Sequence, residues 1–413
     1  MSNIYDPSLA PLGEDKIRWV ASYMPLLNAI GKDFEERRPL AGLRVAMSIH
    51  LEAKTAYLAL TLAKAGAEVS VTGSNPLSTR DDIAAALVAR GITVFAHHGA
   101  SEAQYKQDLQ HTLACRPQLI LDDGGDFVGL LHGACADLAA ELRGGCEETT
   151  TGVIRLRARE RDGSLAFPMI SVNDAACKHL FDNRYGTGQS TLTAIMAVTN
   201  LTIASRSVVV AGYGWCGKGV AMRARGLGAR VIITETDAVK ALEACMDGFE
   251  VMTMAEAAAQ GDIFITVTGC IDVITAEHFK RMKDGVLLAN AGHFDCEINK
   301  HDLEALAAEI LPRKPHITGY RMADGRMLNL LAEGRLVNLA AGMGHPAEIM
   351  DMSFALQAKS LEYLATADNL DKRLYAVPPE IDRSVAEMKL SALRIAIDRL
   401  TPRQEEYLHG YSG

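Results

Sequence analysis

Short apolar runs alternate with amphipathic stretches through the first part of the chain. The apolar runs predict five strands, over Arg44–His50, Glu68–Thr72, Thr93–Ala96, Gln118–Asp122 and Met169–Val172. The stretches between them are rich in Ala, Leu and Lys and predict helices, for example over Thr55–Ala65 and Asp81–Arg90. Alternation of strand and helix is typical of a parallel sheet with helices on both faces.

A second series of the same kind follows, without an internal repeat or a low-complexity linker. Its predicted strands are Ser207–Ala211, Arg230–Thr234, Asp262–Thr266 and Gly285–Ala289. A long helix is predicted over Ala347–Leu364, and an Arg- and Glu-containing tail runs from Asp382 to Gly413. Because 413 residues exceed what one core usually holds, we expect an α/β protein of two doubly wound parallel-sheet domains with a C-terminal helical tail.

Composition and charge exclude several classes of protein. The net charge is −9 and the Lys and Arg residues are scattered, which argues against binding of nucleic acid or a membrane surface. No apolar run is long enough for a membrane span, and the first residues lack a secretion signal. The eight cysteines occur singly between Cys115 and Cys296, without metal-ligand spacing. We therefore expect no metal site and a cytoplasmic protein with reduced thiols.

One glycine-rich motif has a clear physical role. The apolar run that ends at Ala211 leads into G-x-G-x-x-G, formed by Gly212, Gly214 and Gly217, and a helical pattern follows. Such glycines allow a tight turn, close approach of a pyrophosphate, and close packing of helix on strand. Glu235 lies 23 residues after Gly212, near the spacing of a ribose-binding carboxylate, which favours NAD over NADP. The alternative is a glycine-rich turn with a solvated Glu.

Polar residues follow the predicted strands of the first series, where open α/β sheets bind ligands. They are His50, Asp123, Glu148 and Asn173, and beyond them Lys178 and Asp182 are four residues apart, on one face of any helix that forms there. Each has an ordinary structural interpretation, such as a core histidine or a surface ion pair worth about 0.3–0.5 kcal/mol. Their grouping at one sheet edge favours a ligand site but does not identify a reaction.

Five blocks of sequence resemble the signature blocks of the S-adenosylhomocysteine hydrolase family. They are EETTTG at 147–152, Val172–Asp174 with Lys178 and FDN at 181–183, GYGWCGKG at 212–219, AGHFD at 291–295 and LAEGRLVNL at 331–339. The resemblance runs in order from about residue 15 to the C-terminal helix. The chain is most similar to the shorter archaeal and thermophile-type members, which include S-inosylhomocysteine hydrolases.

The resemblance implies reversible cleavage of a nucleoside–homocysteine thioether, with NAD bound throughout. The 4′ C–H of ribose is too weak an acid for any side chain, but oxidation of the 3′-hydroxyl places it next to a carbonyl. Elimination of the thiolate, addition of water and reduction of the ketone complete the cycle. The implied domains are a substrate-binding domain (1–183 and 347–381), a Rossmann NAD-binding domain (184–346) and a tail (382–413). A homo-oligomer, dimer or tetramer, is also implied, with hinges near 174–188 and 344–346.

The resemblance also implies roles for individual residues. The groups that handle the 3′-hydroxyl and hold the ribose would be Lys178, Asp182 and Glu148. His50 and Asp123 would be the acid–base pair for the 4′ proton and the 5′ position, with His293 beside the nicotinamide. Substrate contacts are implied for Glu52, Lys54, Thr55 and His345. Cofactor contacts are implied for Thr149, Thr150, Thr151, Asn183, Gly212, Gly214, Trp215, Cys216, Gly217, Glu235, Thr268, Gly269 and Asn338.

The chain departs from common family members at the purine site. Their His-Met-Thr-Val-Glu-Thr run is His-Leu-Glu-Ala-Lys-Thr here, so that Glu52 and Lys54 replace Thr and Glu. Adenine has a donor at N6 and an acceptor at N1, whereas hypoxanthine reverses both. A carboxylate and an ammonium suit hypoxanthine at least as well as adenine. The inosyl thioether is therefore an alternative substrate, and a salt bridge that merely lines the pocket is the other interpretation.

Two further departures concern the cofactor side. The usual Lys-Pro-Asp-His-Tyr-Arg-Tyr ending, which in the family reaches a neighbouring subunit's NAD site, is absent, and Thr187 replaces a thiol found near the active site of many members.

Two other functions remain open: an NAD-linked dehydrogenase of hydroxy acids and a catalytically inactive NAD-sensing regulator. The first would need its catalytic groups in the cofactor domain, and the second usually loses the active-site residues that are all present here.

Overall fold

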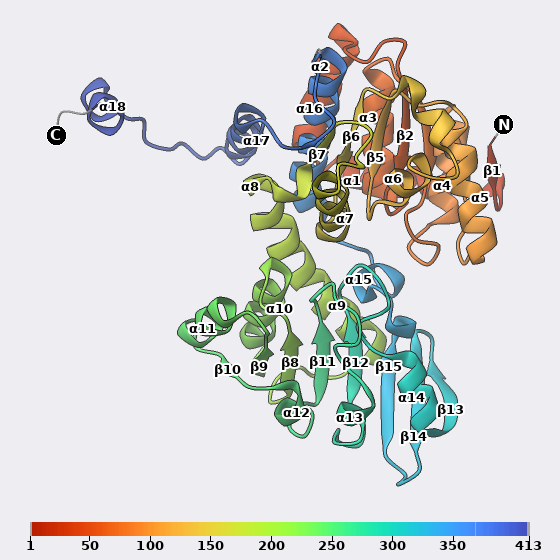
Figure 1. The fold of residues 1–413 in the computed structure, drawn as a ribbon, viewed down its shortest axis with the longest axis vertical. Coiled ribbons are helices and arrows are strands. Elements are labelled where there is room, and N and C mark those ends of the chain that lie inside the picture. Colours follow the sequence, from red (N-terminus) through yellow and green to blue (C-terminus); the bar gives the residue numbers. More distant parts are fainter. Residues whose placement is uncertain (1, 368, 411–413) are drawn as a thin grey trace.

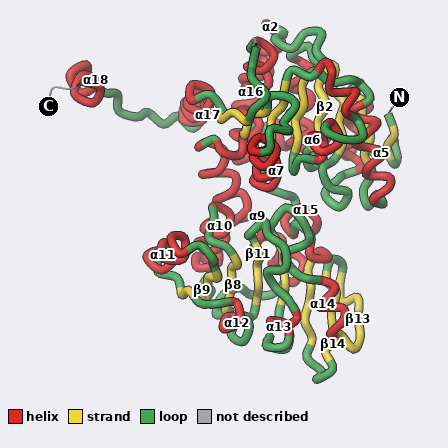
Figure 2. The backbone as a smooth tube through the Cα atoms, in the orientation of Figure 1, coloured by secondary structure: helices red, strands yellow, loops and turns green. Residues whose placement is uncertain are grey.

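The computed structural model describes residues 2–367 and 369–410, and it contains two α/β halves, each built on an eight-stranded sheet (Figure 1). The last three residues of the expected tail, 411–413, lie outside the described residues. Helices lie on both sides of the strands in each half (Figure 2).

The first sheet is parallel throughout. Its order is β1-β4-β3-β2-β5-β6-β7-β16, with strands Asn3–Ile4, Thr93–Ala96, Glu68–Thr72, Arg44–Ser48, Leu119–Asp122, Gly144–Glu147, Met169–Ser171 and Leu374–Ala376. The chain runs outward from β2 in both directions, so the strand order reverses between β2 and β5. Ligands of open α/β sheets bind beyond the carboxyl ends of the strands at such a point.

Alternate residues of β2 show how the core is divided. Val45 and Met47 pack into a cluster on one face of the sheet, and Ala46 packs into another cluster on the opposite face. The first face is covered by α1 to α4 and by α16 and α17: Ala10–Ala21, Pro25–Arg37, Ala53–Lys64, Asp81–Ala89, Ala347–Thr366 and Pro379–Ala392. The other is covered by α5 to α7: Glu102–Leu113, Asp126–Leu131 and Thr150–Arg161.

The second sheet is mixed. Its order is β10-β9-β8-β11-β12-β15-β14-β13, with strands Glu250–Val251, Arg230–Thr234, Ser207–Ala211, Ile263–Thr266, Leu287–Asn290, Met327–Leu331, Ile317–Met322 and Ala307–Lys314. The strands from β10 to β15 are parallel, whereas β14 and β13 add an antiparallel edge. The expected α/β fold is confirmed, and this edge lies outside the parallel strands that were predicted. Its helices are α9 to α15: Thr187–Thr199, Trp215–Gly226, Ala238–Met246, Met254–Ala257, Ala276–Phe279, Lys300–Leu306 and Val337–Ala340.

Two connections join the halves. The first passes through α8 (Ala176–Lys178), a π-helix over His179–Gly186, and α9; the second returns from α15 to α16. β16 then pairs with β7 and completes the first sheet. From α17 the chain extends away from both halves to α18 (Pro402–His409) (Figure 1).

The nine predicted strands are confirmed, with ends that shift by at most two residues. Two strands that lie between predicted ones were missed, the two-residue β10 and β6. β6 begins Gly144-Gly145 and ends in Glu147, and glycine and acidic residues disfavour strands in isolation. β6 is buried along its length between β5 and β7, so tertiary pairing decides its conformation. No helix among residues 2–367 and 369–410 is both long and apolar enough to cross a membrane.

Candidate active site and cofactor cleft

A cavity of about 1220 Å³ lies between the two halves and is lined by both. The first half contributes residues that directly follow β2, β5, β6 and β7, and the second contributes residues that follow β8, β9, β11 and β12. The carboxyl edges of both sheets therefore face one space. All six predicted catalytic residues line it: His50, Asp123, Glu148, Lys178, Asp182 and His293.

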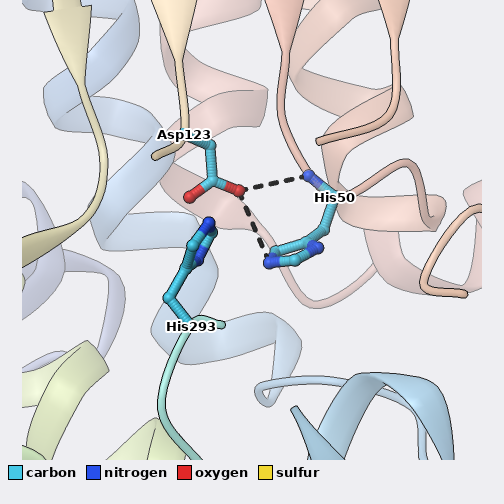
Figure 3. Close-up of side chains that lie close together, drawn as sticks. All are labelled: His50, Asp123 and His293. Carbon is cyan, nitrogen blue, oxygen red and sulfur yellow. Dashed lines mark hydrogen bonds and ion pairs between the residues drawn. The ribbon is translucent and has the colours of Figure 1, made fainter. Parts of the chain in front are cut away.

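One cluster in the cavity consists of His50, Asp123 and His293 (Figure 3). His50 and Asp123 follow neighbouring strands of the first sheet, whereas His293 comes from the loop after β12 in the second half. His50 Nε2 lies 3.5 Å from Asp123 Oδ2, and one nitrogen or oxygen of each residue lies within 4.8 Å of the others. Ser74 Oγ donates to Asp123 Oδ2 at 2.8 Å, and Ser78 Oγ bonds His50 Nδ1 at 2.6 Å.

The electrostatics of this cluster favour neutral imidazoles beside an ionised carboxylate. Burial lowers the pKa of His50 below its ordinary value and lowers the pKa of His293 to about 4. Burial raises the pKa of Asp123, but the two histidines and the Ser74 hydroxyl outweigh it, so this pKa lies below its usual range. The imidazoles can accept protons near neutral pH. The same donors would also suit a divalent transition metal, a grouping that residue spacing had not indicated.

A second cluster consists of Lys178, Asp182, Glu148 and Asn183. Lys178 Nζ donates to Asn183 Oδ1 at 2.7 Å and lies 3.2 Å from Asp182 Oδ2 and 3.5 Å from Glu148 Oε1. The helix expected to place Lys178 and Asp182 on one face is α8 continued by the π-helix. π-Helical turns are rare and often occur at functional sites.

This cluster has one cation and two carboxyl groups, all buried. Burial lowers the pKa of Lys178, but Asp182 and Glu148 outweigh it and the pKa lies above its ordinary value. Burial, together with the Asp182 charge, raises the pKa of Glu148 to about 8, although Lys178 opposes this. Burial also raises the pKa of Asp182, but Lys178 and His345 hold it well below its usual range. In the free protein the lysine is therefore an ammonium, whereas a lysine that acts by itself as a base near neutral pH would need a lowered pKa.

Two supporting residues of this cluster were not anticipated. Ser353 Oγ donates to Asp182 Oδ2 at 2.9 Å, and Gln357 Nε2 donates to Glu148 Oε2. Both are fully buried on α16. Their spacing was a usable signal, because polar residues four apart in an otherwise apolar stretch share one helix face.

The four residues expected at the substrate all line the cavity: Glu52, Lys54, Thr55 and His345. Lys54 Nζ lies 2.7 Å from Glu52 Oε2 and donates to Met343 O at 3.1 Å. The salt bridge considered from the sequence is therefore formed. Thr55 Oγ1 donates to the His50 carbonyl at 2.6 Å. His345 Nδ1 bonds Asp182, which joins the residues expected at the substrate to the second cluster.

The glycine motif has the geometry that dinucleotide binding requires. Gly212 has φ +103°, and a Cβ at Gly214 would meet nothing within 4 Å, so the backbone there is open to a ligand. A Cβ at Gly217 would overlap the Gly212 carbonyl, which accounts for the third glycine. Helix α10 begins directly after Gly214, with its N-terminus at the cavity.

Glu235 follows β9, and its carboxylate accepts the backbone N–H of Tyr213 at 2.7 Å and of Thr236 at 2.7 Å. Burial raises the pKa of Glu235, but the backbone N–H of Asp237 at 3.1 Å and the two bonds just named outweigh burial, so the group is an anion. An anion at this position suits a free ribose hydroxyl and repels a 2′-phosphate. The residues fit NAD.

Most of the predicted cofactor residues line the cavity: Thr149, Thr150, Thr151, Asn183, Gly212, Gly214, Trp215, Cys216, Glu235, Thr268 and Gly269. Gly217 and Asn338 are not among the lining residues. Asn338 is buried and donates to Ser190 Oγ at 2.9 Å, while its Oδ1 has no protein hydrogen-bond partner.

The fold and the site define a dinucleotide-dependent enzyme whose substrate cavity lies between a Rossmann half and a second α/β half. Comparison with known proteins gives the family. The S-adenosyl-L-homocysteine hydrolase model matches residues 2–139, and the NAD-binding domain model of the same family matches residues 183–344. The chain belongs to the S-adenosyl-L-homocysteine hydrolase family, and NAD is its cofactor.

Curated relatives carry two names. An adenosylhomocysteinase from Thermococcus kodakarensis is 58% identical over 99% of this chain and 97% of its own length. An S-inosyl-L-homocysteine hydrolase from Methanopyrus kandleri is 55% identical over 99% of this chain and 97% of its own length. The resemblance seen in the sequence is confirmed, and the two names differ only in the purine.

Proposed function

We propose that this enzyme reversibly hydrolyses S-adenosyl-L-homocysteine to homocysteine and adenosine. The observation that carries the proposal is the presence of two proton-handling clusters in one cavity that is also lined by a dinucleotide-binding motif. NAD, when bound, supplies reversible oxidation of the 3′-hydroxyl of the ribose. The side chains then have to move protons at two separate positions of the sugar.

Lys178, Asp182 and Glu148 hold the ribose hydroxyls and move the 3′ proton. The contact between Lys178 and Glu148 is the longest in the cluster, at 3.5 Å, so a ribose hydroxyl inserts there most readily. Glu148 then bonds the hydroxyls, and Asp182 orients the Lys178 Nζ toward the 3′ oxygen. As the 3′ proton passes to Lys178 Nζ, the ammonium gives one of its own protons to the Asp182 carboxylate 3.2 Å away, so Asp182 carries the proton until the ketone is reduced. Lys178 stays positively charged throughout and stabilises negative charge as it develops on the 3′ oxygen.

His50, Asp123 and His293 act at the 4′ and 5′ positions. A neutral His50 accepts the 4′ proton once the 3′ carbon is a ketone, and the conjugate acid protonates the departing thiolate. Asp123 orients His50 and stabilises its cationic form. His293 comes from the other half, so the cluster is complete only when the halves are close together, and closure also excludes water.

The inosyl thioether is the second candidate, and the Glu52–Lys54 pair is the observation that favours it. Hypoxanthine N1–H can donate to the carboxylate while O6 accepts from the ammonium. Adenine can use the same pair in the opposite order, with N6 donating to Glu52 and N1 accepting from Lys54. The two purines are therefore distinguished by which residue faces N1. Turnover of both thioethers by the same preparation decides between them: a preference of at least tenfold for the inosyl compound removes adenosine as the main product.

The purified protein tests the reaction as a whole. We expect it to release free thiol and nucleoside from the thioether without accumulating NADH. Lys178→Ala and Asp182→Ala should each abolish release while NAD remains bound. Thiol release that persists in both variants would refute the mechanism, and net formation of NADH with each turnover would indicate a dehydrogenase instead.

We further propose domain limits at 1–183 with 347–381, and at 184–346, with hinges near 174–188 and 344–346. A homo-oligomer is proposed because the segment that follows α17 extends away from both halves (Figure 1) and exposes four large apolar side chains, Leu393, Ile395, Ile397 and Leu400. A dimer or tetramer in solution would support the homo-oligomer, and a monomer would exclude it.

The eight cysteines are unpaired, which suits a location in the reducing cytoplasm.

A further inference from the structure

A second pocket, of about 730 Å³, lies on the far side of the loop that carries Asp123. It is formed between α5, α6 and α7, and both Asp126 and Arg155 line it. Neither residue lines the large cavity, and the mechanism proposed above uses neither.

One glycine separates this pocket from the His50, Asp123 and His293 cluster. Arg155 Nη1 donates to the carbonyl of Gly124 at 2.8 Å, and a Cβ at Gly124 would lie 2.5 Å from His293 Nε2. The imidazole and the guanidinium therefore meet the same residue. Gly124 has φ +112°, a conformation that other residues rarely adopt, so the wall between them has no side chain.

The charges of the pocket also reach the catalytic cluster. Burial is the main cause of the low pKa of His293, but the Asp126 charge opposes it and the Arg155 charge adds to it. Arg155 Cζ lies 4.7 Å from the centre of the Phe294 ring, which keeps the guanidinium beside the residue next to His293. The charges of the pocket therefore act on the site where the thiolate leaves, although the Gly124 backbone stands between the two.

Asp126 and Arg155 form only a loose pair. Asp126 Oδ1 lies 3.6 Å from Arg155 Nη1, and Asp126 Oδ2 accepts the hydroxyl of Tyr105 at 2.8 Å. Only one of the five donors of the guanidinium is committed, to Gly124. An α-amino acid carries a carboxylate and an ammonium on one carbon, and it could pair with both groups at once. The planar guanidinium suits the carboxylate, and the carboxylate of Asp126 suits the ammonium.

We propose that Arg155 and Asp126 form the amino-acid subsite for the homocysteine part of the substrate. The inference rests on the proposed function, because it places the sulfur at the His50, Asp123 and His293 cluster. Four bonds lead from that sulfur to the carboxylate carbon of homocysteine, a reach of about 5 Å when extended. The amino-acid end of the substrate would pass beside Gly124, which has no side chain to block it, to reach the pair on the other side. The pair therefore selects a zwitterionic amino-acid thiol over other thiols.

The reverse reaction, with nucleoside and a thiol as substrates, tests this with Arg155→Gln and Asp126→Asn. Three thiols are compared: homocysteine, aminopropanethiol, which lacks the carboxylate, and mercaptobutyrate, which lacks the ammonium. Arg155→Gln should raise the KM for homocysteine and mercaptobutyrate about tenfold and leave that for aminopropanethiol unchanged. Asp126→Asn should raise the KM for homocysteine and aminopropanethiol but not that for mercaptobutyrate.

Arg159→Gln is the matched control, because Arg159 lines the same pocket one helical turn further along α7. It should leave every KM within about twofold of the wild type. Equal increases for all three thiols in Arg155→Gln would show a structural effect on the Gly124 loop, and unchanged values would show no contact; either result overturns the subsite.

Reduction of bound NAD by nucleoside alone separates this proposal from the proposed function. That half-reaction needs no thiol, so it should proceed in wild type and in both variants. If the wild type fails it, the proposed function is wrong. If it proceeds but the variants do not discriminate among the thiols, only the subsite is wrong.

Discussion

Replacement of Glu147 tests whether a buried carboxyl group holds both catalytic loops in place. Glu147 Oε1 accepts the N–H of Gly124 at 2.9 Å, the N–H of Thr149 at 2.8 Å and the Thr149 hydroxyl at 2.9 Å. These bonds link the loop after β5, which carries Asp123, to the loop after β6, which carries Glu148. The side chain is fully buried, and its Oε2 has no hydrogen-bond partner.

The expected magnitude follows from these contacts. Glu147→Ala removes three hydrogen bonds of about 1 kcal/mol each and leaves the buried Gly124 N–H unpaired, which costs about 1–3 kcal/mol more. We therefore expect a loss of about 4–6 kcal/mol in the free energy of unfolding. Glu147→Gln keeps the Oε1 acceptor and all three bonds, so at pH 5 it should lie within about 1 kcal/mol of wild type.

The pH dependence gives a second readout. Burial, and then the neighbouring Asp122, raise the pKa of Glu147 well above its ordinary value. Folding therefore takes up a proton, and the stability this provides is complete below the pKa of an unfolded Glu and is lost as the pH rises. Gln does not titrate, so Glu147→Gln should gain stability relative to wild type between pH 5 and pH 8, measured by urea unfolding. A variant that loses relative stability over this range, or a Glu147→Ala protein as stable as wild type, would refute the reasoning.

Three further predictions concern the site and its supports. Glu148→Gln should raise the KM for nucleoside about tenfold and remove an ionisation near pH 8 from the kcat/KM profile, because burial raises the pKa of Glu148 to about 8; a profile that keeps the ionisation assigns it elsewhere. His293→Asn should lower kcat by about 10²–10⁴-fold with NAD still bound, and the loss of rate that protonation of this imidazole causes in wild type should appear near pH 4, because burial lowers the pKa of His293 to about 4. Gly219→Ala places a Cβ on the Arg184 carbonyl and should lower the melting temperature by several degrees, whereas Gly226→Ala on the same helix meets nothing within 4 Å and should raise it slightly. Equal shifts for the two glycines would exclude the close packing of α10 on the π-helix as the cause.

Much of the fold was predictable because its signals are local. Buried parallel strands appear as continuous apolar runs, so strands such as Val208–Ala211 within β8 need no tertiary information. The antiparallel edge was not predictable in this way, because β13 is largely exposed and lacks a regular apolar pattern. β6 was missed because its Gly-Gly sequence forms a strand only between two neighbours that pair with it.

The residues of the candidate site also fall into those that a local pattern indicates and those that only the folded chain brings to the site. The strand-end rule brought His50, Asp123 and Glu148 to one edge, and all three line the cavity. Ser353 lies 171 residues after Asp182, which it contacts, and Gln357 lies 209 residues after Glu148. No local pattern assigns such partners.

The sequence alone determined where the backbone turns tightly, which residues end the strands, and that an anion follows β9, because glycine conformations and strand patterns depend on near neighbours. Only the tertiary structure decided the protonation states: Lys178 stays charged and Glu148 becomes a weak acid because two carboxyl groups and one ammonium are buried together. It also decided that His293 joins His50 and Asp123 from the other half. Charge interactions act through space and grow as water is excluded, so they depend on neighbours that only the folded chain supplies.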